Sequence, residues 1–152
     1  MIVIVDYGVG NLFSLKSSFD AIGVETVVSG DIDTIKQSSK IILPGVGAFC
    51  DAVNKLKETG LFDVLINEAK NKKPILGICL GMQMLFDKSF EKGEYEGLGL
   101  ISGEIRPISE VIPKNLKIPQ IGWNSLIIKK DNHSLFKYIK EGDFVYFVHS
   151  YY

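Results

Sequence analysis

The segment Gly77-Ile78-Cys79-Leu80-Gly81 has the residue types and the spacing of a nucleophile turn. Cys79 stands where an apolar run at 75–78 ends and a helical pattern begins. The flanking glycines permit the sharp strand-to-helix turn that exposes a nucleophile. A helix that starts there favours the thiolate, and the amide of Leu80 can stabilise an oxyanion. The pattern predicts acyl transfer through a thioester on Cys79; the alternative is a buried structural cysteine on a glycine-containing turn.

A second glycine-containing loop, Pro44-Gly45-Val46-Gly47-Ala48-Phe49, follows the apolar run at 40–43. Its glycines permit backbone conformations that present N–H groups to a ligand, and open α/β sheets bind ligands at the carboxyl ends of their strands. The loop predicts an oxyanion-hole wall or a substrate cradle; the alternative is a plain connection between strand and helix. The other cysteine, Cys50, lies in a helical apolar stretch and is interpreted as a core residue.

A thiolate catalyst usually works with a histidine base, and the chain has two histidines. His133 lies in the polar turn Asp131-Asn132-His133-Ser134, which is typical of a solvated loop histidine. His149 lies in the aromatic run at 144–152. Composition alone therefore nominates His149 as the base.

The loop Asp6-Tyr7-Gly8-Val9-Gly10-Asn11 begins like a dinucleotide-binding turn. Phe13 stands where the third glycine of that motif would be, and the chain has no Walker-type phosphate loop. Nucleotide binding is therefore not supported. Asn11 is interpreted as a helix cap that could also meet a partner.

Length and composition exclude several classes of protein. With 152 residues, 46% apolar and 23% charged, the chain is neither disordered nor a coiled coil nor a collagen-like repeat. A net charge of −1 does not favour nucleic acid or an anionic membrane as a general partner. Two cysteines and two histidines predict neither a disulfide framework nor a metal site. The sequence shows no signal-peptide pattern and no long apolar run, so a cytoplasmic location is expected.

The elements that must position Cys79 alternate between strand and helix patterns. The first half predicts strands at 2–5, 24–28, 40–43 and 75–78, and helices at 11–22, 49–56, 61–71 and 81–86. This alternation predicts an α/β fold in which an open three-layer, mostly parallel sheet has helices on both faces.

The second half predicts shorter strands at 103–108, 126–129 and 144–152. They are interpreted as an antiparallel extension within one domain of residues 1–152. The last strand is aromatic through Tyr152, whereas domains usually end in polar residues. We therefore expect a domain that is incomplete at its C-terminus; the alternative is a docked edge strand.

Several runs together resemble one family, the class I (triad-type) glutamine amidotransferases, and within it the glutaminase subunits of imidazole glycerol phosphate synthase. The runs appear in the family's order and span the chain. They are Asp6-Tyr7-Gly8-Val9-Gly10-Asn11-Leu12, Leu43-Pro44-Gly45-Val46-Gly47-Ala48-Phe49, Gly77-Ile78-Cys79-Leu80-Gly81-Met82-Gln83, Gly97-Leu98-Gly99-Leu100-Ile101-Ser102-Gly103, Ile121-Gly122-Trp123-Asn124 and Tyr146-Phe147-Val148-His149-Ser150-Tyr151-Tyr152.

The resemblance implies roles for particular residues. Cys79 would attack the carboxamide of L-glutamine, and the backbone at Val46, Gly47 and Leu80 would form the oxyanion hole. The residues that would hold glutamine are Gly47, Gln83, Glu91, Ser150 and Tyr151. The residues that would meet a cyclase subunit, a (β/α)₈ barrel that receives the ammonia, are Asn11, Trp123 and Tyr146. In relatives the Pro-Gly-Val-Gly backbone reorients when that partner binds. The resemblance implies no cofactor.

Two departures from the family pattern change these expectations. The family's catalytic histidine and glutamate lie in a His-Pro-Glu motif that does not occur in these 152 residues. His149 matches a different histidine of the family, so it is withdrawn as the base. A polypeptide of these residues alone is expected to hydrolyse glutamine negligibly. At Gln120 relatives often carry histidine, which affects details of the partner interface.

Three other interpretations remain open. The chain could supply ammonia to a sugar amidotransferase of surface-polysaccharide synthesis, or act as a non-catalytic glutaminase-like binding module. It could also be an unrelated cysteine hydrolase with the same turn, although this leaves the run Ile121-Gly122-Trp123-Asn124 unexplained.

Overall fold

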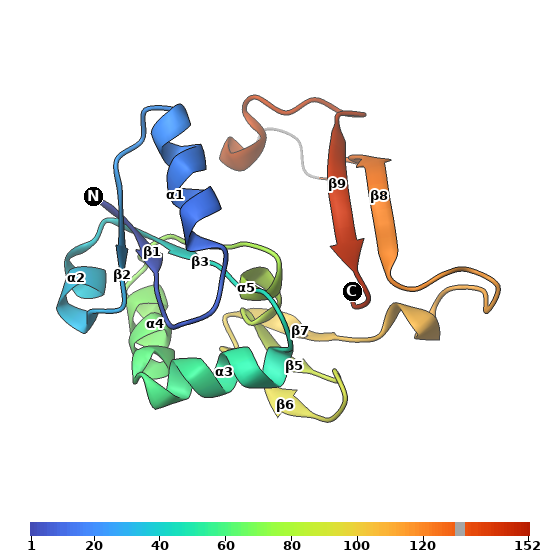
Figure 1. The fold of residues 1–152 in the computed structure, drawn as a ribbon, viewed down its shortest axis with the longest axis horizontal. Helices are drawn as coiled ribbons and strands as arrows, with labels where there is room; N and C mark the ends of the chain where they lie inside the picture. Colours follow the sequence, from blue (N-terminus) through green and yellow to red (C-terminus); the bar gives the residue numbers. More distant parts are fainter. Residues whose placement is uncertain (130–132) are drawn as a thin grey trace. The chain divides into compact units, whose positions relative to one another are not determined.

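The computed structural model describes residues 1–129 and 133–152. Contacts between residues divide the chain into two compact units, Met1–Arg106 and Pro107–Tyr152. Figure 1 shows the helices and strands of each unit.

The first unit is built on a parallel sheet of four strands in the order β2-β1-β3-β4. The strands are β1 (Ile2–Val5), β2 (Thr26–Ser29), β3 (Lys40–Leu43) and β4 (Ile75–Gly77). The helices are α1 (Leu12–Ala21), α2 (Ile32–Gln37), α3 (Phe49–Glu58), α4 (Leu61–Lys70) and the short α5 (Leu80–Gln83). Because connections between parallel strands are right-handed, this strand order puts α1 on one face and α2, α3 and α4 on the other.

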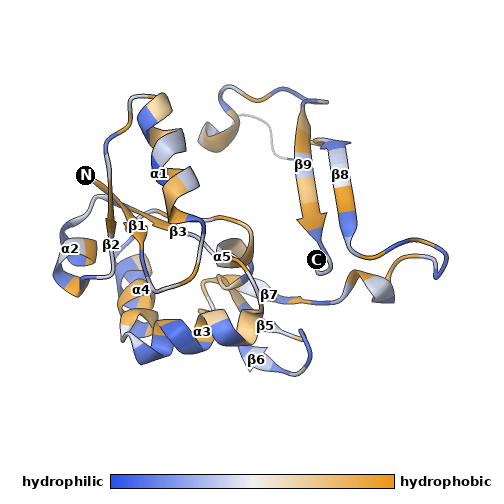
Figure 2. Ribbon diagram, viewed as in Figure 1, coloured by the Kyte–Doolittle hydropathy of each residue, from blue (hydrophilic) through white to orange (hydrophobic). Residues whose placement is uncertain are grey.

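The core lies between the sheet and the face formed by α2, α3 and α4. Side chains alternate along a strand, so Val3 and Val5 of β1 point to this face, as do Ile41 and Leu43 of β3. They pack in one buried cluster with residues of these three helices, namely Ile35, Phe49, Leu56, Leu61 and Leu65. Figure 2 shows the hydrophobic colour running along β1 and β3.

A second sheet in the first unit has the order β6-β5-β7. Its strands are β5 (Phe86–Ser89), β6 (Tyr95–Glu96) and β7 (Ile101–Ile105). The central strand β5 runs antiparallel to β6 and parallel to β7, with an irregularity between Phe86 and Lys88.

The second unit contains one antiparallel ribbon of two strands, β8 (Gln120–Ser125) and β9 (Phe144–His149). Two short 3-10 helices, η1 (Ile108–Glu110) and η2 (Ser134–Phe136), complete it. One face of the ribbon is apolar and exposed, and it consists of Ile121, Trp123, Phe144, Tyr146 and Val148.

Within the described parts of the chain, no helix has the length and apolar character needed to cross a membrane.

The α/β class and the parallel sheet with helices are confirmed. The helix predicted at 81–86 is present but shorter, because α5 ends at Gln83 and Phe86 begins β5. The strand predicted at 126–129 is wrong: the strand is Gln120–Ser125, which pairs with β9. The predicted turn at 131–132 lies outside the described residues. The single domain of residues 1–152 stays a prediction.

Candidate functional site

Cys79 occupies a strained turn between β4 and α5. Its φ is +55° and its ψ is −118°, in a region that residues with a side chain rarely adopt. The thiol-bearing residue is exposed. The turn is tied to the neighbouring strand, because the amide of Ile78 donates a hydrogen bond to the carbonyl of Leu43, 3.0 Å away. A strained and exposed residue at this point is what the sequence predicted for a nucleophile.

The glycines on both sides of Cys79 allow a backbone approach that no side chain would permit. A Cβ at Gly77 would lie 2.4 Å from the Cα of Met82. A Cβ at Gly81 would lie 1.9 Å from the carbonyl oxygen of Leu43, and one at Gly45 would lie 2.6 Å from the amide of Gly81. The loop after β3 and the turn around Cys79 are therefore in backbone contact.

The loop after β3 changes from buried to exposed along its length. Pro44 and Gly45 are buried, whereas Val46 and Gly47 are exposed, and Gly47 has a φ of +87°. No hydrogen bond joins the amide of Val46 or Gly47 to any residue that the structure describes. Together with the amide of Leu80, these N–H groups form a candidate oxyanion hole beside Cys79.

Glu91 binds the end of the same loop, where the loop joins α3. Its carboxylate accepts a hydrogen bond of 2.7 Å from the amide of Phe49, the first residue of α3. Ala48, at the N-cap position, has no side-chain cap of its own, so Glu91 satisfies one of the free amides at this helix end. Glu91 is thus bound to the chain two residues after Gly47, with which it is predicted to hold glutamine.

The sheet of β5, β6 and β7 positions Glu91, which lies two residues after the end of β5. The amide of Phe90 donates to the carbonyl of Ile105 at 2.9 Å, and the amide of Glu91 donates to the hydroxyl of the fully buried Ser89 at 3.2 Å. Both bonds fix the chain immediately after β5.

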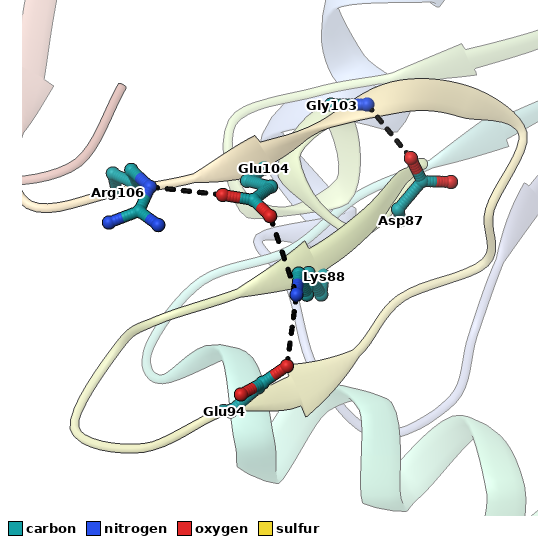
Figure 3. Close-up of polar contacts among 6 residues, drawn as sticks. All are labelled: Asp87, Lys88, Glu94, Gly103, Glu104 and Arg106. Atoms are coloured by element: carbon teal, nitrogen blue, oxygen red, sulfur yellow. Dashed lines mark hydrogen bonds and ion pairs between the residues drawn. The ribbon is translucent and has the colours of Figure 1, made fainter.

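Charged side chains link the three strands (Figure 3). Lys88 pairs with Glu94 at 3.0 Å and with Glu104 at 3.3 Å, and Arg106 pairs with Glu104 at 3.0 Å. The hydrogen bond from Arg106, and then that from Lys88, lower the pKa of Glu104, while hydrogen bonds to Glu94 and Glu104 raise the pKa of Lys88. Asp87 accepts from the amide of Gly103 at 2.9 Å.

Two more predicted residues lie in the first unit. Gln83 is half-buried on α5, where its backbone amide donates to the carbonyl of Cys79 at 3.2 Å. Asn11 is the N-cap of α1, and its side chain accepts from the amide of Ser14. The structure thus groups Cys79, Val46, Gly47, Leu80, Gln83 and Glu91 at one end of β3 and β4.

The remaining predicted residues lie in the second unit. Trp123 and Tyr146 face each other across the ribbon, with ring centroids 5.5 Å apart. The carbonyl of Ser150 accepts from the amide of Ile108, and Tyr151 pairs with Pro107. Both histidines also lie here. His149 Nδ1 is 2.8 Å from the carbonyl oxygen of Tyr151, and His133 caps η2.

Sequence reasoning missed Tyr7. This residue follows β1, is 2% exposed, and donates a hydrogen bond of 2.8 Å to the carbonyl of Pro44 in the loop after β3. Burial raises the pKa of Tyr7 well above its ordinary value. The sequence signal was an aromatic residue two positions after a buried strand. In the described part of the chain, no group of three or more histidine, cysteine or acidic residues could hold a metal ion.

Comparisons with known proteins find relatives in sequence and in fold. A protein of Aquifex aeolicus called imidazole glycerol phosphate synthase subunit HisH is 49% identical over 98% of this chain and 70% of its own length. The protein of that name from Caldanaerobacter subterraneus is 50% identical over 100% of this chain and 72% of its own length. A solved structure titled glutamine amidotransferase matches the fold with a TM-score of 0.67, over 82% of this chain and 64% of that one, at 16% identity.

The family model described as Glutamine amidotransferase class-I matches residues 3–152. With a match over nearly its whole length, and with a cysteine turn and an adjoining glycine loop in place, the chain belongs to the class-I glutamine amidotransferases.

Proposed function

We propose that this chain is the glutamine-hydrolysing subunit of an imidazole glycerol phosphate synthase and supplies ammonia for histidine biosynthesis. The names of the similar proteins support this. The observation that carries the proposal is the exposed, strained Cys79 beside the unbonded amides of Val46 and Gly47.

The reaction begins when the sulfur of Cys79 attacks the carboxamide carbon of L-glutamine. The carbonyl oxygen becomes an oxyanion, which accepts hydrogen bonds from the amides of Val46, Gly47 and Leu80. The carbon–nitrogen bond then breaks, the nitrogen takes a proton and leaves as ammonia, and a glutamyl thioester remains on Cys79. Water attacks the thioester, which releases glutamate and restores the thiol.

The proton transfers need an acid–base group. These 152 residues do not contain the His-Pro-Glu motif in which the family carries its catalytic histidine and glutamate. We therefore propose that a polypeptide of these 152 residues does not turn over by itself, although it carries the nucleophile and the oxyanion hole.

Glutamine would be held by Gly47, Gln83, Glu91, Ser150 and Tyr151. The carboxylate of Glu91 has the charge to bind the α-ammonium group of the substrate. In this structure one of its oxygens already accepts from the amide of Phe49, which leaves the other oxygen for the substrate. Glu91 would thus connect substrate binding to the first turn of α3.

The partner in this proposal is a cyclase subunit with a (β/α)₈ barrel, which receives the ammonia without loss to water. Trp123 and Tyr146 lie on the exposed apolar face of the ribbon, and Asn11 is exposed at the start of α1. Aromatic side chains of this kind dominate protein–protein interfaces. No cofactor takes part in the proposed reaction.

The test is covalent labelling by the chloroketone analogue of glutamine, with and without a cyclase subunit. We expect one adduct on Cys79, located by mass spectrometry of peptides, and protection by L-glutamine. Cys79→Ala should abolish labelling, whereas the matched variant Cys50→Ala should retain it. Labelling that is absent under both conditions, or that glutamine does not slow, would contradict the proposal.

A further inference from the structure

Tyr7 ties the loop of the oxyanion hole to the first strand of the sheet. Its hydroxyl donates to the carbonyl oxygen of Pro44 at 2.8 Å, and both residues are buried. The bond spans 37 residues of sequence and joins the end of β1 to the end of β3. Among the described residues, the Tyr7 hydroxyl is the hydrogen-bond donor to this buried carbonyl, so its loss would leave a buried acceptor unsatisfied.

The loop is held at both ends and free between them. At the beginning, Tyr7 binds Pro44, and Gly45 lies against the turn of Cys79 so closely that a Cβ would meet the amide of Gly81 at 2.6 Å. At the end, Glu91 binds the amide of Phe49. Between these anchors the amides of Val46 and Gly47 make no hydrogen bond to the described residues. The position of the free amides therefore depends on the two anchors.

We infer that Tyr7 is a positioning residue for the oxyanion hole: its hydroxyl fixes Pro44 so that the amides of Val46 and Gly47 stay beside the sulfur of Cys79. This inference rests on the proposed function, because it assigns Tyr7 a role in the same acyl transfer. Tyr7 is not a catalytic residue in it, since the residue is buried and acts through the backbone of the loop.

Two reagents separate this role from a general effect on folding. The chloroketone analogue of glutamine needs the oxyanion hole, because the thiolate first adds to its carbonyl and the resulting oxyanion must be stabilised before chloride is lost. Iodoacetamide reacts at the same thiol by direct displacement of iodide and forms no oxyanion. The ratio of the two rates at Cys79 therefore reports the alignment of the oxyanion hole. A change in the exposure of the thiol would alter both rates and leave their ratio unchanged.

The ratio is to be measured, with and without a cyclase subunit, for the wild-type chain and for Tyr7→Phe, which keeps the ring and removes only the hydroxyl. We expect the chloroketone rate to fall about tenfold while the iodoacetamide rate stays within about twofold, since loss of a direct oxyanion-hole donor costs about a hundredfold or more and an indirect displacement costs less. Tyr95→Phe is the matched control: it removes one hydroxyl from a half-buried tyrosine of β6, and its ratio should equal that of the wild type.

The outcomes are distinct. An unchanged ratio in Tyr7→Phe, with the wild type labelled normally, would overturn the role of Tyr7 and leave the proposed function standing. Loss of cooperative thermal unfolding in Tyr7→Phe would assign the hydroxyl to global stability and also overturn it. If the chloroketone labels neither protein, with or without the cyclase subunit, while iodoacetamide labels both, the proposed function fails and this inference fails with it.

Discussion

The buried hydroxyl of Tyr7 makes stability depend on pH at the scale of a single residue. Burial raises the pKa of Tyr7 in the folded state, so above the ordinary value of about 10 the unfolded state loses this proton first. The stabilisation from the neutral hydroxyl is full below that pH and decreases above it, by about 1.4 kcal/mol per pH unit. We expect denaturant titrations between about pH 9 and pH 11 to show a steeper loss for the wild type than for Tyr7→Phe. Parallel curves would contradict this expectation.

Thr26 offers a second test at the residue scale. It is 3% exposed in β2, and its hydroxyl has no hydrogen-bond partner among the residues that the structure describes. A buried hydroxyl without a partner is destabilising. Thr26→Val keeps the branched shape and removes the oxygen, so it should raise the free energy of unfolding by about 1 kcal/mol. Thr26→Ser keeps the hydroxyl and should lower it; a stabilised serine variant would argue against this cause.

At the scale of secondary-structure elements, Lys73 connects α2 to α4. Its ammonium group donates to the carbonyls of Ile35 and Lys36 at the end of α2, and it pairs with Glu68 of α4 at 2.6 Å. Both charged side chains are 11% exposed. Lys73→Met would leave the Glu68 carboxylate buried without its partner, which costs about 3–5 kcal/mol.

Chemical denaturation measures that loss, and two variants complete the test. The double substitution of Lys73→Met with Glu68→Leu should regain most of the stability, because no unpaired charge remains. Lys55→Met breaks the exposed pair with Glu58 and should leave the free energy of unfolding nearly unchanged. Equal losses for Lys55→Met and Lys73→Met would show that burial does not determine the cost.

Local sequence signals predicted the first unit well. The spacing of apolar residues and the cap at Asn11 predicted α1, and the glycines around Cys79 predicted the strained turn. The short helix α2 was missed, although Asp31 caps it through the amide of Thr34, because six residues carry too little periodicity. Contacts between distant residues were not predictable in the same way. Tyr7 and Pro44 are 37 residues apart, and their bond depends on the order of the strands.

The second unit shows the limit of such signals. The segment at 126–129 has the residue types of a strand, but the strand forms at Gln120–Ser125, where Gln120 pairs with His149 and Ser125 with Phe144. Strand preference depends on packing against a partner more than on the backbone itself. The partner strand here is β9. The sequence of residues 120–129 does not by itself specify which of them pair with β9.

At the scale of the whole molecule, the apolar face of the ribbon is the predicted binding surface for the proposed cyclase subunit. Trp123→Ala removes the largest exposed ring of this face and should weaken the complex by about 2 kcal/mol, the loss of an interface hot spot. Isothermal titration calorimetry measures the change. Tyr138→Ala is the matched control, since Tyr138 is 85% exposed and lies outside the ribbon. Equal affinities for wild type and Trp123→Ala would place the interface elsewhere.

Activity is the second property of the whole molecule. A polypeptide of these 152 residues should release almost no ammonia from glutamine, because it lacks the His-Pro-Glu motif that carries the family's catalytic histidine and glutamate. A coupled glutamate assay measures the rate, and mass spectrometry establishes that the sample ends at Tyr152. Turnover close to that of a complete glutaminase would refute this expectation.

Trp123 has a practical consequence beyond the interface. It is the single tryptophan of the chain and is 67% exposed. Its fluorescence emission therefore comes from one site in contact with water, and a protein that covers the ribbon would shift this emission to shorter wavelength. The unmodified chain thus carries its own optical probe, with which candidate partners can be screened by titration without an attached dye.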